Sequence, residues 1–93
     1  MIPYSKQNIA NDDIKSVVKV LKSKILTQGK EVVRFEKNIA KFVGSKYSVA
    51  VSSASAALHL SCLALELKKN DILWTVPNTF IASASCALHC QAE

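Results

Sequence analysis

Apolar positions repeat at helical spacing in the first half of the chain. The acidic segment Asn11-Asp12-Asp13 supplies a capping residue and two acids for a helix N-terminus, and the stripe after it consists of Ile14, Val17, Val18 and Leu21. A second stripe, on a helix that begins near Lys30 and ends at Gly44, consists of Val32, Phe35, Ile39 and Phe42 or Val43. The pattern predicts two amphipathic helices joined by a loop over residues 25–29.

Longer apolar runs fill the second half and predict alternating strands and helices. Residues 47–52 are β-branched and short, and Asp71–Val76 forms a similar run that Pro77 ends, so both are expected to be strands. An Ala- and Leu-rich helix is expected over Ala54–Leu67, with Ser53 as its N-cap, and a further helix over Thr79–Cys90. This order predicts an α/β fold with a β-α-β-α parallel unit, right-handed crossovers and interior strands.

We interpret residues 1–93 as one partial domain, with a basic helical segment over 1–46 and the start of a parallel-sheet domain over 47–93. Two parallel strands cannot form a sheet that is covered on both faces, so the sheet is expected to be incomplete. Either another chain completes it or these residues begin a longer polypeptide, and the pattern favours the second interpretation.

The charge is distributed unevenly, since the net charge of +5 comes from the first half. The basic side chains lie on the expected solvent faces of the two helices with hardly any interleaved aromatic residues, which argues against a nucleic-acid partner. Two charge-free stretches, Tyr47–Leu65 and Ile72–Ala92, contain too many polar groups for membrane spans. Residues 1–8 lack the apolar core of a signal peptide, so a cytoplasmic protein without a membrane partner is expected.

Three cysteines, Cys62, Cys86 and Cys90, are an odd number in a chain without a secretory signal, which argues against a disulfide framework. Cys86, His89 and Cys90 are close enough on a helix to suggest metal ligands. A structural zinc site needs four ligands, and the other obvious candidate, His59, lies some thirty residues away. We therefore expect no metal site and interpret the cysteines as small core residues.

Ligands of open α/β sheets bind beyond the carboxyl ends of the strands, which directs attention to the loops Ser52–Ser55 and Val76–Phe80. The first loop places small residues and hydroxyls at a helix N-terminus, where free N–H groups favour an anion such as phosphate. The second adds Phe80, an aromatic ring that could cover a planar cofactor. The structural alternatives are that Ser53 only caps a helix and that Phe80 belongs to the core.

Four blocks of sequence resemble, in order, the sugar-nucleotide aminotransferases of the DegT/DnrJ/EryC1/StrS family. They are Leu26-Thr27-Gln28-Gly29-Lys30 followed by Phe35-Glu36, then Gly44-Ser45-Lys46-Tyr47, then Ser53-Ala54-Ser55-Ala56-Ala57-Leu58-His59-Leu60, and then Leu73–Ala84 with Cys86-Ala87-Leu88. The last block is similar to the branch of the family that acts in pseudaminic acid synthesis. The resemblance covers nearly the whole chain.

The resemblance implies the N-terminal part of the large domain of a fold type I transferase that depends on pyridoxal phosphate. Such an enzyme moves an amino group from L-glutamate to the C4 keto group of a UDP-linked deoxysugar and works as a homodimer. Ala54 and Ser55 match the positions that hold the cofactor phosphate, where the family commonly has Gly-Thr, and Phe80 matches the aromatic residue stacked on the pyridine ring. The positions that line the sugar-nucleotide pocket are matched by Tyr4, Lys24, Ile25, Leu26, Thr27 and Ala54.

The lysine that binds the cofactor covalently belongs to a family segment beyond Glu93, so no catalytic residue is expected in this chain. Lys68 and Lys69 precede the second expected strand and therefore lie at the sheet edge opposite Ser55 and Phe80. We expect the 93 residues alone to be inactive. The alternative function is a natural short homologue that acts as a non-catalytic binding or regulatory subunit of a full-length partner.

Overall fold

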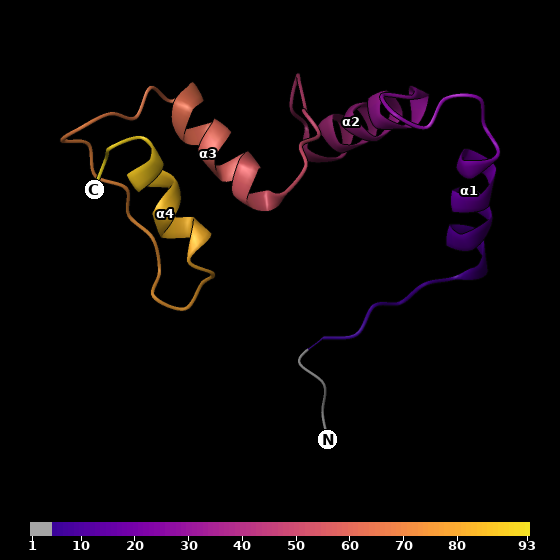
Figure 1. Cartoon of the computed structure of the whole chain (residues 1–93), viewed down its shortest axis with the longest axis horizontal. Coiled ribbons are helices and arrows are strands. Elements are labelled where there is room, and N and C mark those ends of the chain that lie inside the picture. Colours follow the sequence, from indigo (N-terminus) through magenta and orange to yellow (C-terminus); the bar gives the residue numbers. More distant parts are fainter. Residues whose placement is uncertain (1–4) are drawn as a thin grey trace. The chain divides into compact units, whose positions relative to one another are not determined.

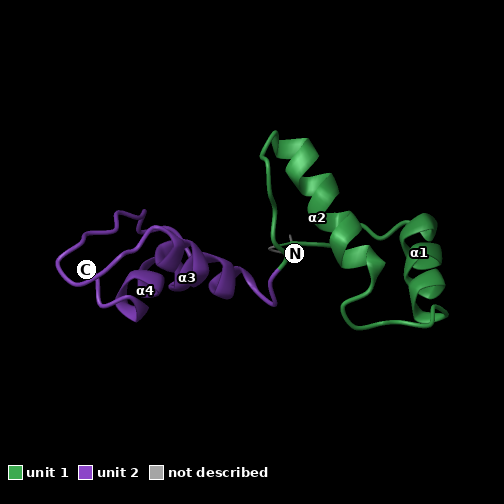
Figure 2. Cartoon of the chain, turned by 90° about the horizontal axis from the view of Figure 1, so that it is seen from above, with its two compact units in different colours: residues 1–50 green, residues 51–93 purple. Residues whose placement is uncertain are grey.

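The structure is a computed structural model that describes residues 5–93. The described residues form four helices and no strand: α1 (Asn11–Leu21), α2 (Lys30–Val43), α3 (Ala54–Ala64) and α4 (Ala82–His89) (Figure 1). The chain divides into two compact units, Met1–Ala50 and Val51–Glu93, coloured separately in Figure 2.

Helix α1 begins one residue earlier than the acidic pattern indicates. Its N-cap is Ala10, whose N–H donates to the Asp13 carboxylate at 2.8 Å, so Asp13 caps the helix where Asn11 was expected to do so. The expected apolar stripe is present, but each of its side chains is at least 41% exposed. Nothing in the described chain packs tightly on this face.

Helix α2 matches the sequence prediction at both ends. It starts at Lys30 and is followed by Gly44, which has a φ of 70° in the left-handed region. The N–H of Ser45 donates to the Ala40 carbonyl at 2.9 Å, which satisfies one of the carbonyls left open at a helix end. The Glu36 carboxylate accepts a hydrogen bond from the Ala50 N–H at 2.8 Å and ties the following segment back to the helix.

Helices α3 and α4 end with the same hydrogen-bonded turn. After α3, Glu66 takes a φ of 58°, its N–H donates to the Leu63 carbonyl, and the Leu67 N–H donates to the Cys62 carbonyl at 3.0 Å. These bonds end α3 three residues before the expected Leu67. Gln91 plays the same part after α4 with a φ of 60°. Neither residue is a glycine. The C-terminal end of α4 agrees with the expected Cys90 to within one residue, whereas the helix starts at Ala82 and not at the expected Thr79.

Small residues allow α3 and α4 to approach closely. The buried side chains of this unit are Cys62 on α3 and, on or just after α4, Ala82, Cys86, Ala87, Cys90 and Ala92. Partly buried Leu67 and Leu73 pack against the cysteines. The expectation that the cysteines are small core residues is confirmed. The core contains no fully buried large side chain, and Trp74 and Phe80 remain 88% and 73% exposed.

The strands expected over 47–52 and 71–76 are not formed, because neither segment is part of a β-ladder among the described residues. A strand exists only where a neighbouring backbone completes its ladder. Residues 71–73 show how such a ladder begins: the Leu73 N–H donates to the Glu93 carbonyl at 2.7 Å, and the Glu93 N–H donates to the Asp71 carbonyl at 2.9 Å. These two bonds bracket Ile72 in the pattern of a parallel pair.

The expected burial of both strand segments is also wrong for the described chain. Val49, Ile72 and Trp74 are 76%, 70% and 88% exposed, because no layer of helices covers either segment.

Across residues 5–93, no helix is long and apolar enough to cross a membrane.

The left-handed turn at Gly44 leads to the first prediction. Gly44→Ala should lower the free energy of unfolding by about 1 kcal/mol, because a Cβ disfavours a positive φ even where, as here, no atom lies within 4 Å of it. Urea unfolding followed by circular dichroism measures the loss. Gly44→Asn is the control, since asparagine tolerates this conformation, and equal losses in both variants would contradict the explanation.

Candidate functional site

Ser53 caps the N-terminus of α3 and leaves the first two backbone N–H groups of the helix without an acceptor in the described chain. The hydroxyl of Ser53 accepts a hydrogen bond from the Ala56 N–H at 3.1 Å, and the Ser53 carbonyl accepts one from the Ala57 N–H at 3.0 Å. Within residues 5–93, the N–H groups of Ala54 and Ser55 have no acceptor. Both residues are exposed, so two backbone donors and one hydroxyl are available to an anion at the positive end of the helix.

Phe80 lies in the turn that leads into α4. Its carbonyl accepts a hydrogen bond from the Ser83 N–H at 3.0 Å, and the hydroxyls of Thr79 and Ser83 are 2.9 Å apart. These two contacts link Phe80 and the preceding Thr79 to Ser83 in the first turn of α4. The aromatic ring itself projects into solvent and is 73% exposed, so it is not a core residue of the described chain.

The packing of α3 on α4 places these two features at one end of the helix pair. Figure 1 shows that the two helices run in the same general direction, so their N-termini lie toward the same end. Ala54 and Ser55 occupy that end of α3, and Phe80 comes just before that end of α4.

The first unit contains a pocket of about 430 Å³ around the loop between α1 and α2. Three of the predicted sugar-nucleotide residues, Lys24, Ile25 and Leu26, line it, whereas Thr27 does not. The remaining lining residues are Lys19, Val20, Ser23, Gly29, Lys30, Glu31 and Val32. Tyr4, which was also assigned to this pocket, lies outside the described residues.

The pocket combines positive charge with apolar walls. The lysines at positions 19, 24 and 30 contribute three ammonium groups, against the single carboxylate of Glu31. Such a lining suits a ligand that has both an anionic group and an apolar or planar part. The tight turn beside the pocket accounts for the glycine at position 29, because a Cβ there would lie 3.0 Å from the carbonyl oxygen of Ile25.

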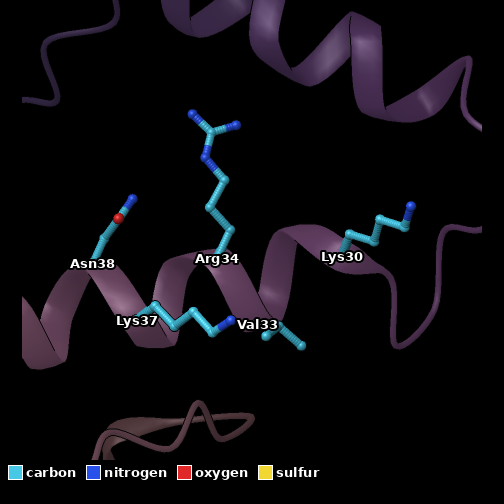
Figure 3. Close-up of a pocket in the computed structure, with 5 residues that line it drawn as sticks. All are labelled: Lys30, Val33, Arg34, Lys37 and Asn38. Carbon is cyan, nitrogen blue, oxygen red and sulfur yellow. The ribbon is translucent and has the colours of Figure 1, made fainter.

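A second hollow, of about 450 Å³, follows the exposed face of α2, and we do not interpret it as a ligand-binding pocket. It is lined by Lys30, Val33, Arg34, Lys37 and Asn38. Figure 3 shows that these side chains spread along the helix and do not converge on one point. Arg34 also has a carboxylate partner, Glu31, at 3.5 Å. We interpret this face as a solvated basic surface.

The contact between α3 and α4 also brings together all the cysteines and both histidines. Cys62 packs with Cys86 and Cys90, and the rings of His59 and His89 have centroids 5.3 Å apart. Burial raises the pKa of the Cys62 thiol, and the adjacent Cys86 and Cys90 thiols raise it further. In the part of the chain that the structure describes, no three such side chains are arranged to hold a metal ion.

The sequence prediction missed Lys19 and Lys30 of the pocket and the proximity of the histidines. Lys19 was assigned to the solvent face of its helix and Lys30 only to the start of the next one, and the turn at residues 23–29 brings both to one pocket. The sequence offered one signal for them: both lysines flank Lys24, which had been assigned to the pocket. The histidine pair had none, because it depends on how two helices pack.

Comparison with known proteins gives a family and several relatives. Residues 7–93 match the DegT/DnrJ/EryC1/StrS aminotransferase family. The chain is 46% identical, over all 93 residues, to the UDP-4-amino-4,6-dideoxy-N-acetyl-beta-L-altrosamine transaminase of Campylobacter jejuni subsp. jejuni serotype O:23/36 (strain 81-176), and it covers 24% of that protein. It is 40% identical over 91 residues to the spore coat polysaccharide biosynthesis protein SpsC of Bacillus subtilis (strain 168), covering 98% of this chain and 23% of that protein.

Solved structures agree with these relatives. The PLP-form of the putative sugar aminotransferase Spr1654 from Streptococcus pneumoniae superposes with a TM-score of 0.87 and 30% identity over 99% of this chain and 24% of that chain. An aminotransferase from Psychrobacter cryohalolentis gives a TM-score of 0.83 and 30% identity over 97% of this chain and 24% of that one. The chain spans about a quarter of the length of the relatives that it matches.

The capping role of Ser53 leads to the second prediction. Ser53→Ala should destabilise the second unit by about 1 kcal/mol, because the Ala56 N–H loses its side-chain acceptor. Chemical denaturation of the 93-residue chain measures the change. Ser61→Ala is the control: the Ser61 hydroxyl donates to the Ala57 carbonyl at 2.8 Å within α3, a bond that contributes little to helix stability. A loss in Ser61→Ala as large as in Ser53→Ala would contradict the capping role.

Proposed function

Because the chain belongs to the DegT/DnrJ/EryC1/StrS aminotransferase family, we propose that it is the N-terminal part of a pyridoxal-phosphate-dependent aminotransferase that transfers an amino group from L-glutamate to the C4 keto group of a UDP-linked deoxysugar. The single observation that carries the proposal is the 46% identity, over the whole chain, to a transaminase whose name specifies a UDP-linked 4-amino sugar. We place the reaction in the cytoplasm and expect a homodimer of the complete protein.

In this proposal the N-terminus of α3 binds the cofactor phosphate. The N–H groups of Ala54 and Ser55 donate to phosphate oxygens, and the Ser55 hydroxyl adds a third donor. The Ser53 hydroxyl accepts a hydrogen bond from the Ala56 N–H. Its part is to keep the first turn of α3 in place. The donors, the exposure and the helix dipole of this end all fit a phosphate group.

Phe80 covers the ring of the cofactor in this proposal. The residue precedes α4 at the same end of the helix pair as Ser55, and it is 73% exposed among the described residues. Aromatic rings stack readily on flat heterocycles. When bound, pyridoxal phosphate supplies the electron sink that amino-group transfer requires. The residues of this chain hold and orient that group.

The sugar nucleotide binds in the pocket of the first unit. The ammonium groups of Lys19, Lys24 and Lys30 face a diphosphate, which carries the charge they complement, while the walls formed by Ile25 and Leu26 contact its less polar parts. Ala54, the other residue assigned to the sugar nucleotide, lies in the second unit.

Amino-group transfer needs a lysine beside the cofactor, and neither lysine of the second unit lies at that end of α3. Lys68 and Lys69 follow the C-terminal end of α3, so the length of that helix, roughly 16 Å at 1.5 Å per residue, separates them from Ser55. We therefore expect the 93-residue chain alone not to catalyse the transfer. The family match and the high identities favour this function over a non-catalytic regulatory homologue.

The proposed cofactor site is tested in a hybrid enzyme in which residues 1–93 replace the matching first quarter of the Campylobacter jejuni transaminase. The hybrid should bind pyridoxal phosphate and aminate the UDP-linked 4-keto sugar. Ser55→Ala should weaken cofactor binding about tenfold, the effect of losing one charge-assisted hydrogen bond. Phe80→Ala should weaken it more than Phe80→Tyr, which keeps an aromatic ring.

Cofactor titration followed by absorbance measures both effects, and Ser61→Ala is the control because Ser61 lies outside the first turn of α3. A hybrid that binds the cofactor equally well with and without Ser55 and Phe80 would contradict the assignment of these residues. A folded hybrid without transaminase activity would contradict the proposed function.

The sugar-nucleotide pocket is tested in the same hybrid. Lys24→Ala should raise the KM for the sugar nucleotide about fivefold and change kcat little, because it removes a charge that contacts the bound substrate and not the reacting carbon. Lys22→Ala is a matched control that removes the same charge two residues away and outside the pocket lining. Steady-state kinetics at fixed salt measures both variants, and equal KM values for the two would contradict the assignment.

A further inference from the structure

The cysteine cluster between α3 and α4 is a feature that the proposed function does not use. Cys62 projects from α3 and contacts Cys86 and Cys90, and the three residues are 4%, 3% and 8% exposed. All three thiols are free. The Cys86 thiol donates to the Ser83 carbonyl at 3.4 Å, so it remains close to its own helix. One cysteine of α3 thus faces two cysteines from α4 and its C-cap.

We propose that Cys62 is the obligatory member of an intramolecular disulfide that joins α3 to α4 when the protein meets a small-molecule disulfide. Cys86 and Cys90 are four residues apart along one helical turn, where Cβ atoms are about 5–6 Å apart. A disulfide needs Cβ atoms about 3.5–4.5 Å apart, so these two cannot pair without unwinding the turn. Cys62 lies on the other helix, so the fixed Cβ–Cβ distance within one helical turn does not apply between Cys62 and either partner.

The reaction proceeds by two thiol–disulfide exchanges. Cys90 is the most exposed of the three and lies at the C-cap, so its thiolate attacks the small disulfide first and releases one small thiol. The Cys62 thiolate then attacks the Cys90 sulfur and releases the second small thiol. Two protein thiols are oxidised, the small disulfide is reduced to two thiols, and the two protons pass to the released thiolates. A later exchange can move the bond from Cys90 to Cys86.

The link would act as an oxidation-sensitive lock on the second unit. It joins the two helices whose N-termini carry Ser55 and Phe80, and it closes a loop that contains the segment between them. Cross-linking reduces the freedom of the unfolded chain, so the oxidised unit should unfold at a higher temperature. The second exchange should become faster as the pH rises, because the raised pKa of Cys62 leaves little thiolate near neutral pH. This lock does not depend on the proposed enzymatic function.

The test exposes the 93-residue chain to oxidised glutathione and follows thiol content, intact mass and peptide maps without reduction. The wild-type chain should lose two of its three thiols, lose two hydrogen atoms in mass, remain a monomer and show Cys62 joined to Cys90 or Cys86. Its thermal unfolding midpoint should rise by about 5 °C or more and return after reduction. Cys86→Ser and Cys90→Ser should each still form a link through Cys62.

Cys62→Ser is the decisive variant and should form no intramolecular disulfide. If it still loses two thiols as a monomer, the pair is Cys86–Cys90 and the proposal is wrong. Disulfide-linked dimers or stable glutathione adducts as the main wild-type products would also overturn it. Circular dichroism of each reduced variant shows that a missing link does not reflect a missing fold, and Cys62→Ala provides a second substitution for the same measurement.

Discussion

The close contact between α3 and α4 is the interaction on which the second unit depends. It is made by small side chains, with Cys62 on one helix facing Cys86 and Cys90 on and just after the other. Small residues let two helix backbones approach closely, and the terminal turns at Glu66 and Gln91 then direct the chain back along the pair. The same contact brings the two N-termini to one end. Packing that involves no ligand therefore places the residues that we assign to the cofactor.

The exposure of the apolar segments follows from a second constraint: a β-strand needs a neighbouring strand to satisfy its backbone hydrogen bonds. A β segment has one row of backbone groups on each side, and both rows need partners when the segment is buried. The two hydrogen bonds between Glu93 and residues 71–73 provide the first rung of a parallel pairing. The rest of that segment, including Trp74, has neither a ladder nor a covering layer. Its apolar sequence is that of a buried strand, but its surroundings are those of a loop.

Local patterns predicted the helices well, whereas features that depend on partners were predicted poorly. The apolar stripe and the glycine of α2 fixed both of its ends, because a helix satisfies its own backbone. The N-cap of α3 at Ser53 was equally local. The C-terminal end of α3 was missed because a glutamate takes the left-handed position there, and α4 starts at Ala82 and not at the expected Thr79. The two strands were predicted but are not formed, because a strand depends on a second segment that pairs with it. The apolar pattern of one segment holds no information about that second segment.

The candidate site divides in the same way. Ala54, Ser55 and Phe80 could be proposed from the sequence because each lies at or just before a helix start, a position that sequence marks by caps, small residues and proline. Lys19 and Lys30 were missed because they reach the pocket only through the turn that Gly29 permits. The described residues thus contain hydrogen-bond donors, an aromatic ring and a basic pocket, which are the means of binding. The two lysines that follow α3 lie at the opposite end of that helix from Ser55, so the second unit offers no amine beside the proposed phosphate site.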